Sequence, residues 1–517
     1  MPIRRLVLAL TRAKRPDLPG SFSQTVESGD PKESGRAMFL GIDLGTSGVK
    51  AVVIDDGGTV VDEAGAPLAV SRPRDGWSEQ DPASWWTATT HAICALDADV
   101  RRQVRGVGLA GQMHGAVLLD DAHRTLRPAI LWNDGRSHAE CAELEAAVPD
   151  LHAITGNLAM PGFTAPKLLW VLRHEPELFA RIATVLLPKD WLRLQLTGVP
   201  ASDLSDSAGT LWLDVAERRW SAPVLAACGL GEGHMPQLFE GNQVTGHLLP
   251  AVAEAWGLSS VPVAAGGGDN AAGAVGVGVV RDGDALLSLG TSGVVFVATA
   301  DHRANPQGAV HAFCHCLPGL WHQMAVHLSA AACIDWGARL TGAGDPAAFF
   351  ALAEAAGPAA GPEIFLPYLS GERTPHNDPH VRGALLGLDH DTDPARVAAA
   401  VLEGVAFALA DGMDALRAAG TVPAQLSVIG GGARSRHWGR IIASVLDTPL
   451  VYLKGGETGP AIGAARLAQL AVDGGTPADV CSAPPTAHVV EPEAGIADRL
   501  AAKRERFRAA YRPIASL

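Results

Sequence analysis

The stretch Leu44-Gly-Thr-Ser-Gly-Val49 occurs a second time, unchanged, as Leu289-Gly-Thr-Ser-Gly-Val294. Each copy lies between two short runs rich in aliphatic and β-branched residues. A strand, a glycine-containing turn and a second strand are typical of a hairpin. Because the matching context extends to both sides, duplication of an ancestral α/β unit explains the repeat better than chance does. The spacing of the copies then sets the size of one half of the protein.

The two glycine loops suit phosphate binding. Glycine permits positive φ and lets the backbone approach a ligand closely. Successive amide N–H groups can then point into one concavity that holds phosphate oxygens, and Thr and Ser hydroxyls add donors. Two tight turns without a ligand are the alternative. We predict that the nucleotide is bound here by Gly45, Thr46, Ser47, Lys50, Gly290, Thr291 and Ser292.

Length and charge narrow the class of protein. A chain of 517 residues is too long for one ordinary core. Strand-rich segments alternate with helical ones such as residues 394–418 and 460–472, which predicts an α/β architecture in each half. The net charge of −14 argues against a nucleic-acid or anionic-membrane partner. No uninterrupted apolar run is long enough to predict a membrane span.

The first 37 residues differ in composition from the rest. They are rich in Lys, Arg, Pro, Gly and Ser and show little periodicity. The apolar run at residues 6–10 is shorter than the hydrophobic region of a signal peptide. We therefore predict a disordered leader at 1–37, or an upstream start codon, rather than a targeting peptide. The seven cysteines are scattered, as expected of reduced thiols in a cytoplasmic protein.

Asp43 ends the first strand-like run, directly before the first loop. A carboxylate in this place can hold Mg²⁺, usually through a bound water. The alternative is an Asp that caps its own turn. The second copy of the loop has Ser288 at the corresponding position. If the Asp only capped its turn, both identical turns would need it, so its presence in one copy favours binding of a single metal ion.

Asp269 follows three consecutive glycines, at the point where an apolar strand gives way to a helix rich in Ala and Gly. The simple alternative is a helix N-cap. A cap does not need three glycines, which cost backbone entropy. We therefore predict that Asp269 is an active-site carboxylate.

Two further segments suggest ligand contacts. Residues 425–435 repeat the order of strand, triple glycine and helix, and a flat nucleotide base could lie against Gly431 and Gly432. A tight β–α turn is the alternative. In the first half, the clustered polar residues of 111–115 and 132–136 suit a polyhydroxylated ligand better than a core. The candidate sugar contacts are Met113, His114, Trp132, Asp134 and Arg136, with a core histidine and a surface arginine as alternatives.

Taken in this order, the motifs resemble the FGGY carbohydrate kinases, whose fold is similar to that of actin, hexokinase and the Hsp70 ATPase domain. The resemblance runs from about Met38 to the C-terminus and is carried by IDLGTSGVK (42–50), WSEQDP (77–82), GQMHG (111–115), LRPAILWNDGR (126–136), ITGNLAMPGFTAPKLLW (154–170), GGGDNAAGAVGVG (266–278), FLPYLSGERTPHN (365–377) and IGGGARS (429–435). It implies a two-domain, actin-like (ribonuclease H-like) α/β fold with a deep cleft. The sugar-side domain would span 38–280 and the nucleotide-side domain 281–517.

The resemblance also implies an activity, the ATP-dependent phosphorylation of D-xylulose with Mg²⁺, and a homodimer. It assigns Asp269 as general base, places Asp43 near the metal and phosphates, and gives Met113, His114 and Asn270 contacts with the sugar. Gly431 and Gly432 would belong to the adenosine pocket. Two alternatives remain open: a kinase of the same family for another ketopentose or polyol, and an ATP-driven binding protein with an actin-like core.

Overall fold

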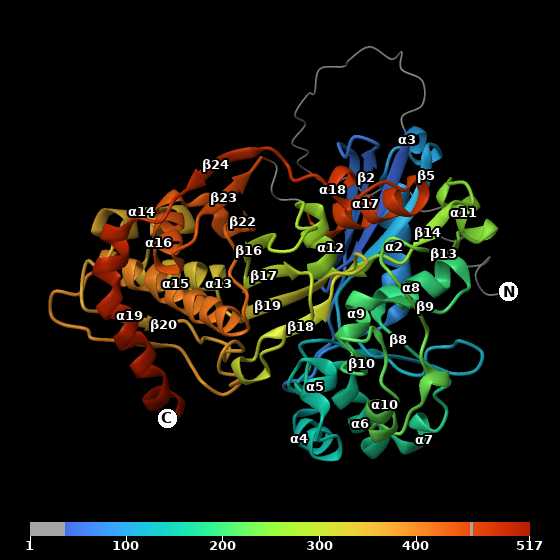
Figure 1. The fold of residues 1–517 in the computed structure, drawn as a ribbon, viewed down its shortest axis with the longest axis horizontal. Coiled ribbons are helices and arrows are strands. Elements are labelled where there is room, and N and C mark those ends of the chain that lie inside the picture. The colour runs from blue at the N-terminus through green and yellow to red at the C-terminus, as the bar shows by residue number, and fades with distance from the viewer. Residues whose placement is uncertain (1–36, 455–458) are drawn as a thin grey trace, which may run out of the picture.

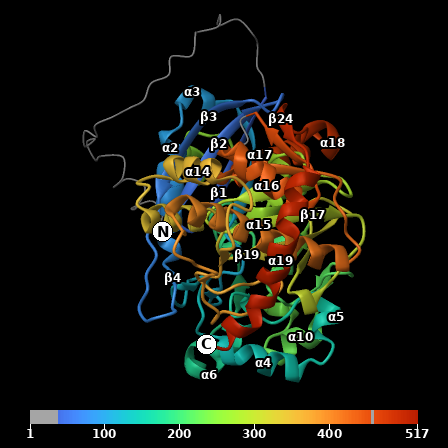
Figure 2. The same cartoon turned by 90° about the vertical axis from the view of Figure 1, so that its left-hand side faces the viewer.

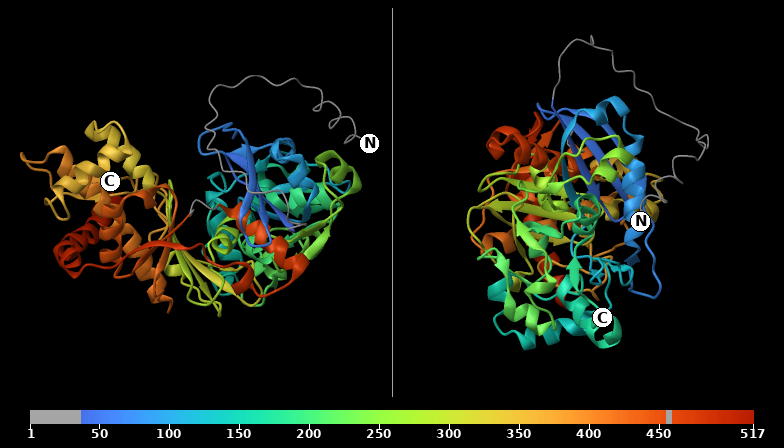
Figure 3. Two further views of the ribbon diagram at one scale, coloured as in Figure 1. Left: turned by 90° about the horizontal axis from the view of Figure 1, so that it is seen from above. Right: turned by 90° about the vertical axis from the view of Figure 1, so that its right-hand side faces the viewer.

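The computed structural model describes residues 37–454 and 459–517, so the leader predicted at 1–37 lies outside the described residues except for Ala37. The described chain forms two bodies, each built on a seven-stranded mixed sheet with helices packed on it (Figure 1). Seen from above, the bodies lie at opposite ends of the molecule (Figure 3). The two-domain α/β fold expected from the sequence is confirmed.

The first sheet has the spatial order β13-β14-β5-β1-β2-β3, and β15 pairs with the end of β5. Its strands are β1 (Met38–Leu44), β2 (Gly48–Asp55), β3 (Val60–Pro67), β5 (Val104–Gly111), β13 (Val244–His247), β14 (Pro262–Ala264) and β15 (Gly267–Gly268). The second sheet has the order β18-β19-β17-β16-β22-β23-β24. Its strands are β16 (Ala285–Leu289), β17 (Gly293–Thr299), β18 (His311–Cys314), β19 (Trp321–His327), β22 (Leu426–Ile429), β23 (Leu450–Leu453) and β24 (Thr486–Val490).

The two sheets repeat one topology. In the first, β1 is antiparallel to β2 and parallel to β5, and β2 is antiparallel to β3. In the second, β16 has the same relations to β17 and β22, and β17 is antiparallel to β19. Each repeated glycine loop therefore joins the two strands of a hairpin at the centre of its sheet. The structure thus confirms the predicted hairpins, and the repeated topology agrees with a duplication.

Helices cover the sheets and fill an additional lobe of the first half. The first half carries α2 (Pro82–Ala95), α3 (Ala98–Arg102), α4 (His138–Ala147), α5 (Leu151–Thr155), α6 (Thr164–His174), α7 (Pro176–Phe179), α8 (Pro188–Thr197), α9 (Leu204–Ala208), α10 (Ala222–Ala227), α11 (Pro250–Trp256) and α12 (Asp269–Gly276). The second carries α13 (Ala331–Thr341), α14 (Pro346–Ala356), α15 (Pro394–Ala418), α16 (Arg436–Leu446), α17 (Pro460–Asp473), α18 (Pro477–Val480) and α19 (Ala494–Ala515). Figure 2 looks onto this second body, where α19 crosses α15 and α16.

Short two-stranded sheets complete the described structure. They pair β4 (Glu79–Gln80) with β7 (Ala129–Ile130), β6 (Val117–Leu119) with β8 (Thr184–Leu186), β9 (Ala201–Asp203) with β12 (Gln237–Phe239), β10 (Leu213–Asp214) with β11 (Arg219–Trp220), and β20 (Ile364–Leu366) with β21 (Ala384–Leu386). Within residues 37–454 and 459–517, no helix combines the length and apolarity that a bilayer crossing needs.

The two helices predicted from periodicity are both present, and local signals set their ends. α15 begins at Pro394, after Asp393 accepts a hydrogen bond from the amide of Arg396. Proline suits the first helical turn because the amide it lacks would have no partner there. α17 also begins with proline, and Gly474, with φ 74°, follows its last residue.

α17 belongs to the second half of the sequence, yet it packs on the first sheet, beside the strands of the first half (Figures 1 and 3). It approaches through glycines: a Cβ on Gly41 of β1 or Gly108 of β5 would lie within 2 Å of a carbonyl oxygen of α17. The predicted boundary at 280/281 is therefore not a clean division between the two bodies, because one later helix returns across it.

Candidate active site

Two carboxylates meet at the edge of the first sheet where its parallel strands end. Asp43 of β1 and Gly267 of β15 both pair with Ala110, from opposite sides of β5. Asp269 follows β15 directly as the first residue of α12. Adjacent strands lie about 4.8 Å apart, so the two Asp residues flank the end of a single strand.

Burial raises the pKa of both carboxyl groups toward neutral pH. Burial, reinforced by the negative charge of Asp269, raises the pKa of Asp43 to about 7. Burial also raises the pKa of Asp269 to about 6, although hydrogen bonds from Asn270 oppose the shift. Such raised values are typical of catalytic acids and bases.

Asp269 does not act as the N-cap considered from sequence. The N-cap position is Gly268, and no side chain caps the helix. One carboxylate oxygen of Asp269, Oδ1, accepts hydrogen bonds from the backbone amide and from Nδ2 of Asn270, at 2.7 and 2.9 Å. Met113 packs against the preceding glycine, where a Cβ would lie 2.9 Å from its sulfur. The structure thus brings together Met113, Asp269 and Asn270.

His114 follows β5 in a left-handed conformation, with φ 68°. Its Nδ1 lies 2.6 Å from the carbonyl oxygen of Gly209. Because a carbonyl only accepts hydrogen bonds, Nδ1 carries the proton and Nε2 of the neutral ring is an acceptor. Burial lowers the pKa of His114 to about 3, which keeps the ring neutral at pH 7. Such a ring can accept a hydrogen bond from a sugar hydroxyl.

Sequence reasoning missed Lys167, which supports His114. Its buried Nζ donates to the carbonyl oxygens of His114 and Gly162, at 2.8 and 2.7 Å. Burial lowers the pKa of this ammonium to about 7. The only signal in the sequence is a single lysine within the apolar segment of α6, inside one of the family-like motifs.

Arg373 from the second half was missed as well. It donates to Nε2 of His311 at 3.3 Å. It also lines a cavity of about 450 Å³ together with Trp132 and Gly162 of the first half. Trp132 donates from its indole to the hydroxyl of Thr46. This cavity therefore lies between residues of the two halves, as expected of a cleft.

Two of the predicted sugar contacts, Asp134 and Arg136, have buried side chains that pair with each other, and Asp134 also lines the cavity of about 450 Å³. Asp134 accepts from the amide of Ser78 and pairs with Arg136 at 2.6 Å. The Arg136 guanidinium also pairs with Glu79 at 2.8 Å and lies over the ring of Trp77, 3.6 Å from its centroid. With 1% of its side chain exposed, Arg136 has a structural role, which corrects the prediction.

The first loop also departs in part from the prediction. The Thr46 hydroxyl donates to Gln112 and accepts from Trp132, so it is engaged within the protein. Lys50 lies opposite Asp43 and pairs with Glu63 of β3 at 2.9 Å, and its nucleotide contact stays a prediction. Exposed hydroxyl residues are present in both loops, namely Ser47, Thr291 and Ser292. The glycines Gly45 and Gly290 lie in the same two turns.

The second half offers a separate cavity of about 500 Å³. Gly431 and Gly432 line it, together with residues of α13 and α14 such as Ile334 and Phe350. Apolar side chains opposite bare backbone suit a flat, partly apolar group such as a nucleotide base.

A magnesium ion fits the donors present. Among the described residues there is no cluster of three or more His, Cys, Asp or Glu side chains that could hold a metal alone. Mg²⁺ bound with nucleotides relies on one or two carboxylates, water and phosphate oxygens. The Oδ1 atom of Asp43 is buried and lacks a hydrogen-bond partner in the described structure, so it can face a hydrated cation.

Comparison with known proteins agrees with this architecture. Residues 38–276 match the N-terminal domain of the FGGY family of carbohydrate kinases, and residues 285–472 match its C-terminal domain. The xylulose kinase of Escherichia coli (strain K12) is 58% identical over 437 residues, which cover 84% of this chain and 90% of that protein. The xylulose kinase of Bacillus subtilis (strain 168) is 39% identical over 437 residues, 83% of this chain and 87% of that protein.

A solved structure supports the same conclusion. The crystal structure of a kinase described as a xyloylose kinase from Brucella ovis superposes with a TM-score of 0.89 at 51% identity, covering 93% of this chain and 99% of that one. The chain belongs to the FGGY family of carbohydrate kinases. It is therefore an ATP-using kinase, which decides against the alternative of an actin-like binding protein.

Proposed function

We propose that this kinase transfers the γ-phosphoryl group of ATP to D-xylulose, forming ADP and D-xylulose 5-phosphate. The observation that carries the proposal is the pair Asp43 and Asp269 at the strand ends, with Met113 packed against Gly268 and the neutral ring of His114 next to Met113 in the chain. The choice of D-xylulose rests on the 58% identity to a xylulose kinase.

In this mechanism, Asp269 accepts the proton of the sugar's terminal hydroxyl as that oxygen attacks the γ-phosphorus in line. Phosphoryl transfer depends mainly on positioning and charge stabilisation, so a carboxylate with a moderately raised pKa suffices. His114, Met113 and Asn270 orient the sugar, and the two glycine loops offer amides and hydroxyls to the phosphates. Gly431 and Gly432 receive the adenosine.

Asp43 is the residue that would hold Mg²⁺, through a bound water. When bound with ATP, the ion neutralises charge on the phosphate oxygens. Closure of the two bodies around the substrates would exclude water and limit ATP hydrolysis.

The assay that tests the proposal is ADP release from Mg-ATP with and without D-xylulose. We expect turnover that depends on the sugar, and a panel of other ketopentoses and polyols to give lower kcat/KM. A higher kcat/KM with another member of the panel would overturn the choice of D-xylulose but not that of sugar phosphorylation.

His114→Ala is expected to raise the KM for the sugar about tenfold, because one hydrogen bond to a neutral acceptor contributes about 1.4 kcal/mol at most. The KM for ATP should stay within about twofold. Steady-state kinetics with each substrate varied in turn measure both values.

His114→Asn is the control for backbone strain, since Asn tolerates positive φ better than Ala. It should show the same rise in the KM for the sugar. An unchanged sugar KM with weakened nucleotide binding would show that His114 has been placed on the wrong substrate.

The pH dependence follows from Asp269. Its carboxylate must be ionised to accept a proton, and its pKa is raised to about 6. We therefore expect kcat/KM for the sugar to fall about tenfold per pH unit below pH 6. Asn270→Ala removes a hydrogen bond that stabilises the ionised form, so it should move this decline to higher pH. A decline that does not move in Asn270→Ala would assign it to another group, such as Asp43, whose pKa is raised to about 7, or ATP itself.

Three further assignments remain predictions, and each can be tested by a simple measurement. The homodimer can be checked by light scattering of the purified protein, and the cytoplasmic location by fractionation of cells. The domain boundary at 280/281 can be mapped by limited proteolysis.

A further inference from the structure

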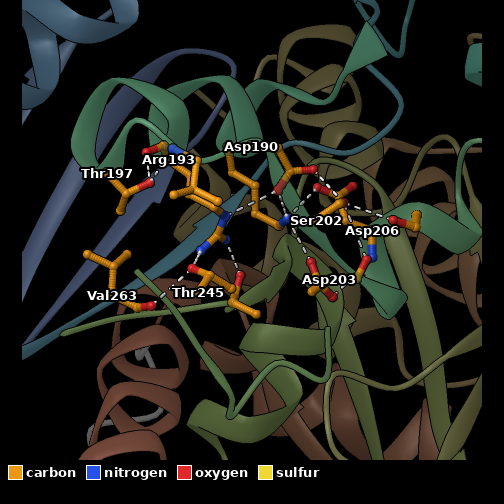
Figure 4. Close-up of polar contacts among 12 residues, drawn as sticks. Asp190, Arg193, Thr197, Ser202, Asp203, Asp206, Thr245 and Val263 are labelled. Carbon is orange, nitrogen blue, oxygen red and sulfur yellow. Dashed lines mark hydrogen bonds and ion pairs between the residues drawn. The ribbon is translucent and has the colours of Figure 1, made fainter. Parts of the chain in front are cut away.

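Five charged side chains form a fully buried cluster beneath the site. Lys189, Asp190 and Arg193 come from α8, Asp203 from the end of β9, and Asp206 from α9 (Figure 4). All five side chains have an exposed fraction of 0%. Lys189 lies at the centre, with its Nζ 2.5, 2.7 and 3.3 Å from carboxylate oxygens of the three Asp residues. The mechanism above uses none of these groups.

The cluster contacts the end of the glycine run, residues 266–268, through Ser205. The Ser205 hydroxyl donates to Asp203, whose carboxylate also accepts from the Ser205 amide at 2.8 Å. The same hydroxyl oxygen accepts a hydrogen bond from the amide of Gly268 at 3.1 Å. Gly268 is the residue directly before Asp269.

A second contact, through Arg193, holds the two residues directly before the same run. The guanidinium donates from Nη1 to the carbonyl of Ala264 at 2.7 Å and from Nη2 to that of Ala265. Nη1 also donates to Thr245, which in turn donates to the carbonyl of Val263 (Figure 4). The planar fork of an arginine can bind two successive carbonyls in this way, and a lysine cannot.

The glycine run needs such support because it has no side chains of its own with which to pack. In the described structure its strand pairing is limited to Gly267 and Gly268 with the end of β5, and the amide of Gly266 donates to the carbonyl of Gly241 at 2.8 Å. Glycine also has the greatest backbone freedom. Three carboxyl groups face two cations in the cluster, and burial raises the pKa of Asp206 well above its usual range.

We propose that this buried cluster is a positioning element for Asp269, with Ser205 holding the last residue of the glycine run and Arg193 holding the two residues before it. The inference rests on the proposed function of Asp269 as base. Ser205 and Arg193 are positioning residues and touch neither substrate. A catalytic base displaced by about 1 Å can lose about 10²-fold in rate. Loss of one contact therefore lowers turnover without changing nucleotide binding.

Ser205→Ala tests the first contact, and Ser207→Ala is its matched control. Ser207 is a buried serine of the same helix whose hydroxyl donates to Ser202 at 2.8 Å and not to the glycine run. We expect Ser205→Ala to lower kcat about tenfold or more, with the KM for ATP within twofold. Ser207→Ala should keep kcat within twofold and lose a similar amount of thermal stability.

Arg193→Lys tests the second contact. It keeps the buried charge but gives up one of the two carbonyls, and we expect the same fall in kcat at unchanged KM for ATP. If this variant does not fold, the comparison of Ser205→Ala with Ser207→Ala still tests the inference. Equal kcat for Ser205→Ala and Ser207→Ala would overturn the inference alone. Absence of turnover with every sugar in the unmodified chain would overturn the inference together with the proposed function.

Discussion

Asp269→Asn is expected to lower kcat for the sugar by about 10²–10⁴, the usual contribution of a general base. The substitution keeps the size and shape of the side chain, so the backbone conformation next to Gly268 should not change. An amide cannot accept the proton of the attacking hydroxyl. Binding of ATP, measured by calorimetry, should remain within about twofold. A variant that retains near-normal kcat would rule out Asp269 as the base.

Asp43→Asn is the matched comparison, because it removes a carboxylate from the same strand ends. Its role toward the metal predicts a defect that higher Mg²⁺ concentration partly relieves. The defect of Asp269→Asn should not respond to Mg²⁺. Equal Mg²⁺ responses in the two variants would contradict the separate roles proposed for the two carboxylates.

The largest effect on stability is expected from Gly463→Ala. Gly463 of α17 lies against α12 so closely that a Cβ would be 1.7 Å from the carbonyl oxygen of Ala272. The helices must separate to admit it, and such overpacking costs about 1–3 kcal/mol or more. We expect the melting temperature to fall by several degrees in a thermal unfolding experiment.

Gly273→Ala is the control on the facing helix. A Cβ there meets its nearest atom, in Pro460, at 3.9 Å, which is an ordinary contact. Since Ala favours a helix over Gly by about 1 kcal/mol, this variant should be as stable as the parent or more so. An equal fall in melting temperature in both variants would show that the close approach of α12 and α17 does not cause the loss of stability.

Much of the fold follows from local sequence. The repeated loop LGTSGV marks both hairpins, because the residues on each side favour strands and the glycines favour the turn. The place of Asp269, between a glycine run and a helix at the end of the strands, follows from the same kind of local signal. These signals are contained within about ten neighbouring residues.

The errors concern contacts between distant segments. Arg136 looks like a ligand-binding arginine in sequence, and only the structure shows Trp77 under its guanidinium and Glu79 beside it. Lys167 looks like a chance lysine until its two carbonyl partners are known. Such pairings depend on how separate elements pack, and no local pattern encodes them.

The return of α17 to the first sheet has a consequence for biosynthesis. Phe39, Val52 and Ile54 of that sheet are buried in a cluster with Ala461, Ile462 and Ala465 of α17. A ribosome adding about 5–20 residues per second reaches α17 roughly 20–80 s after completing β1. During that interval the nascent first half has an apolar sheet face without its native cover, and transiently exposed apolar surface of this kind promotes aggregation.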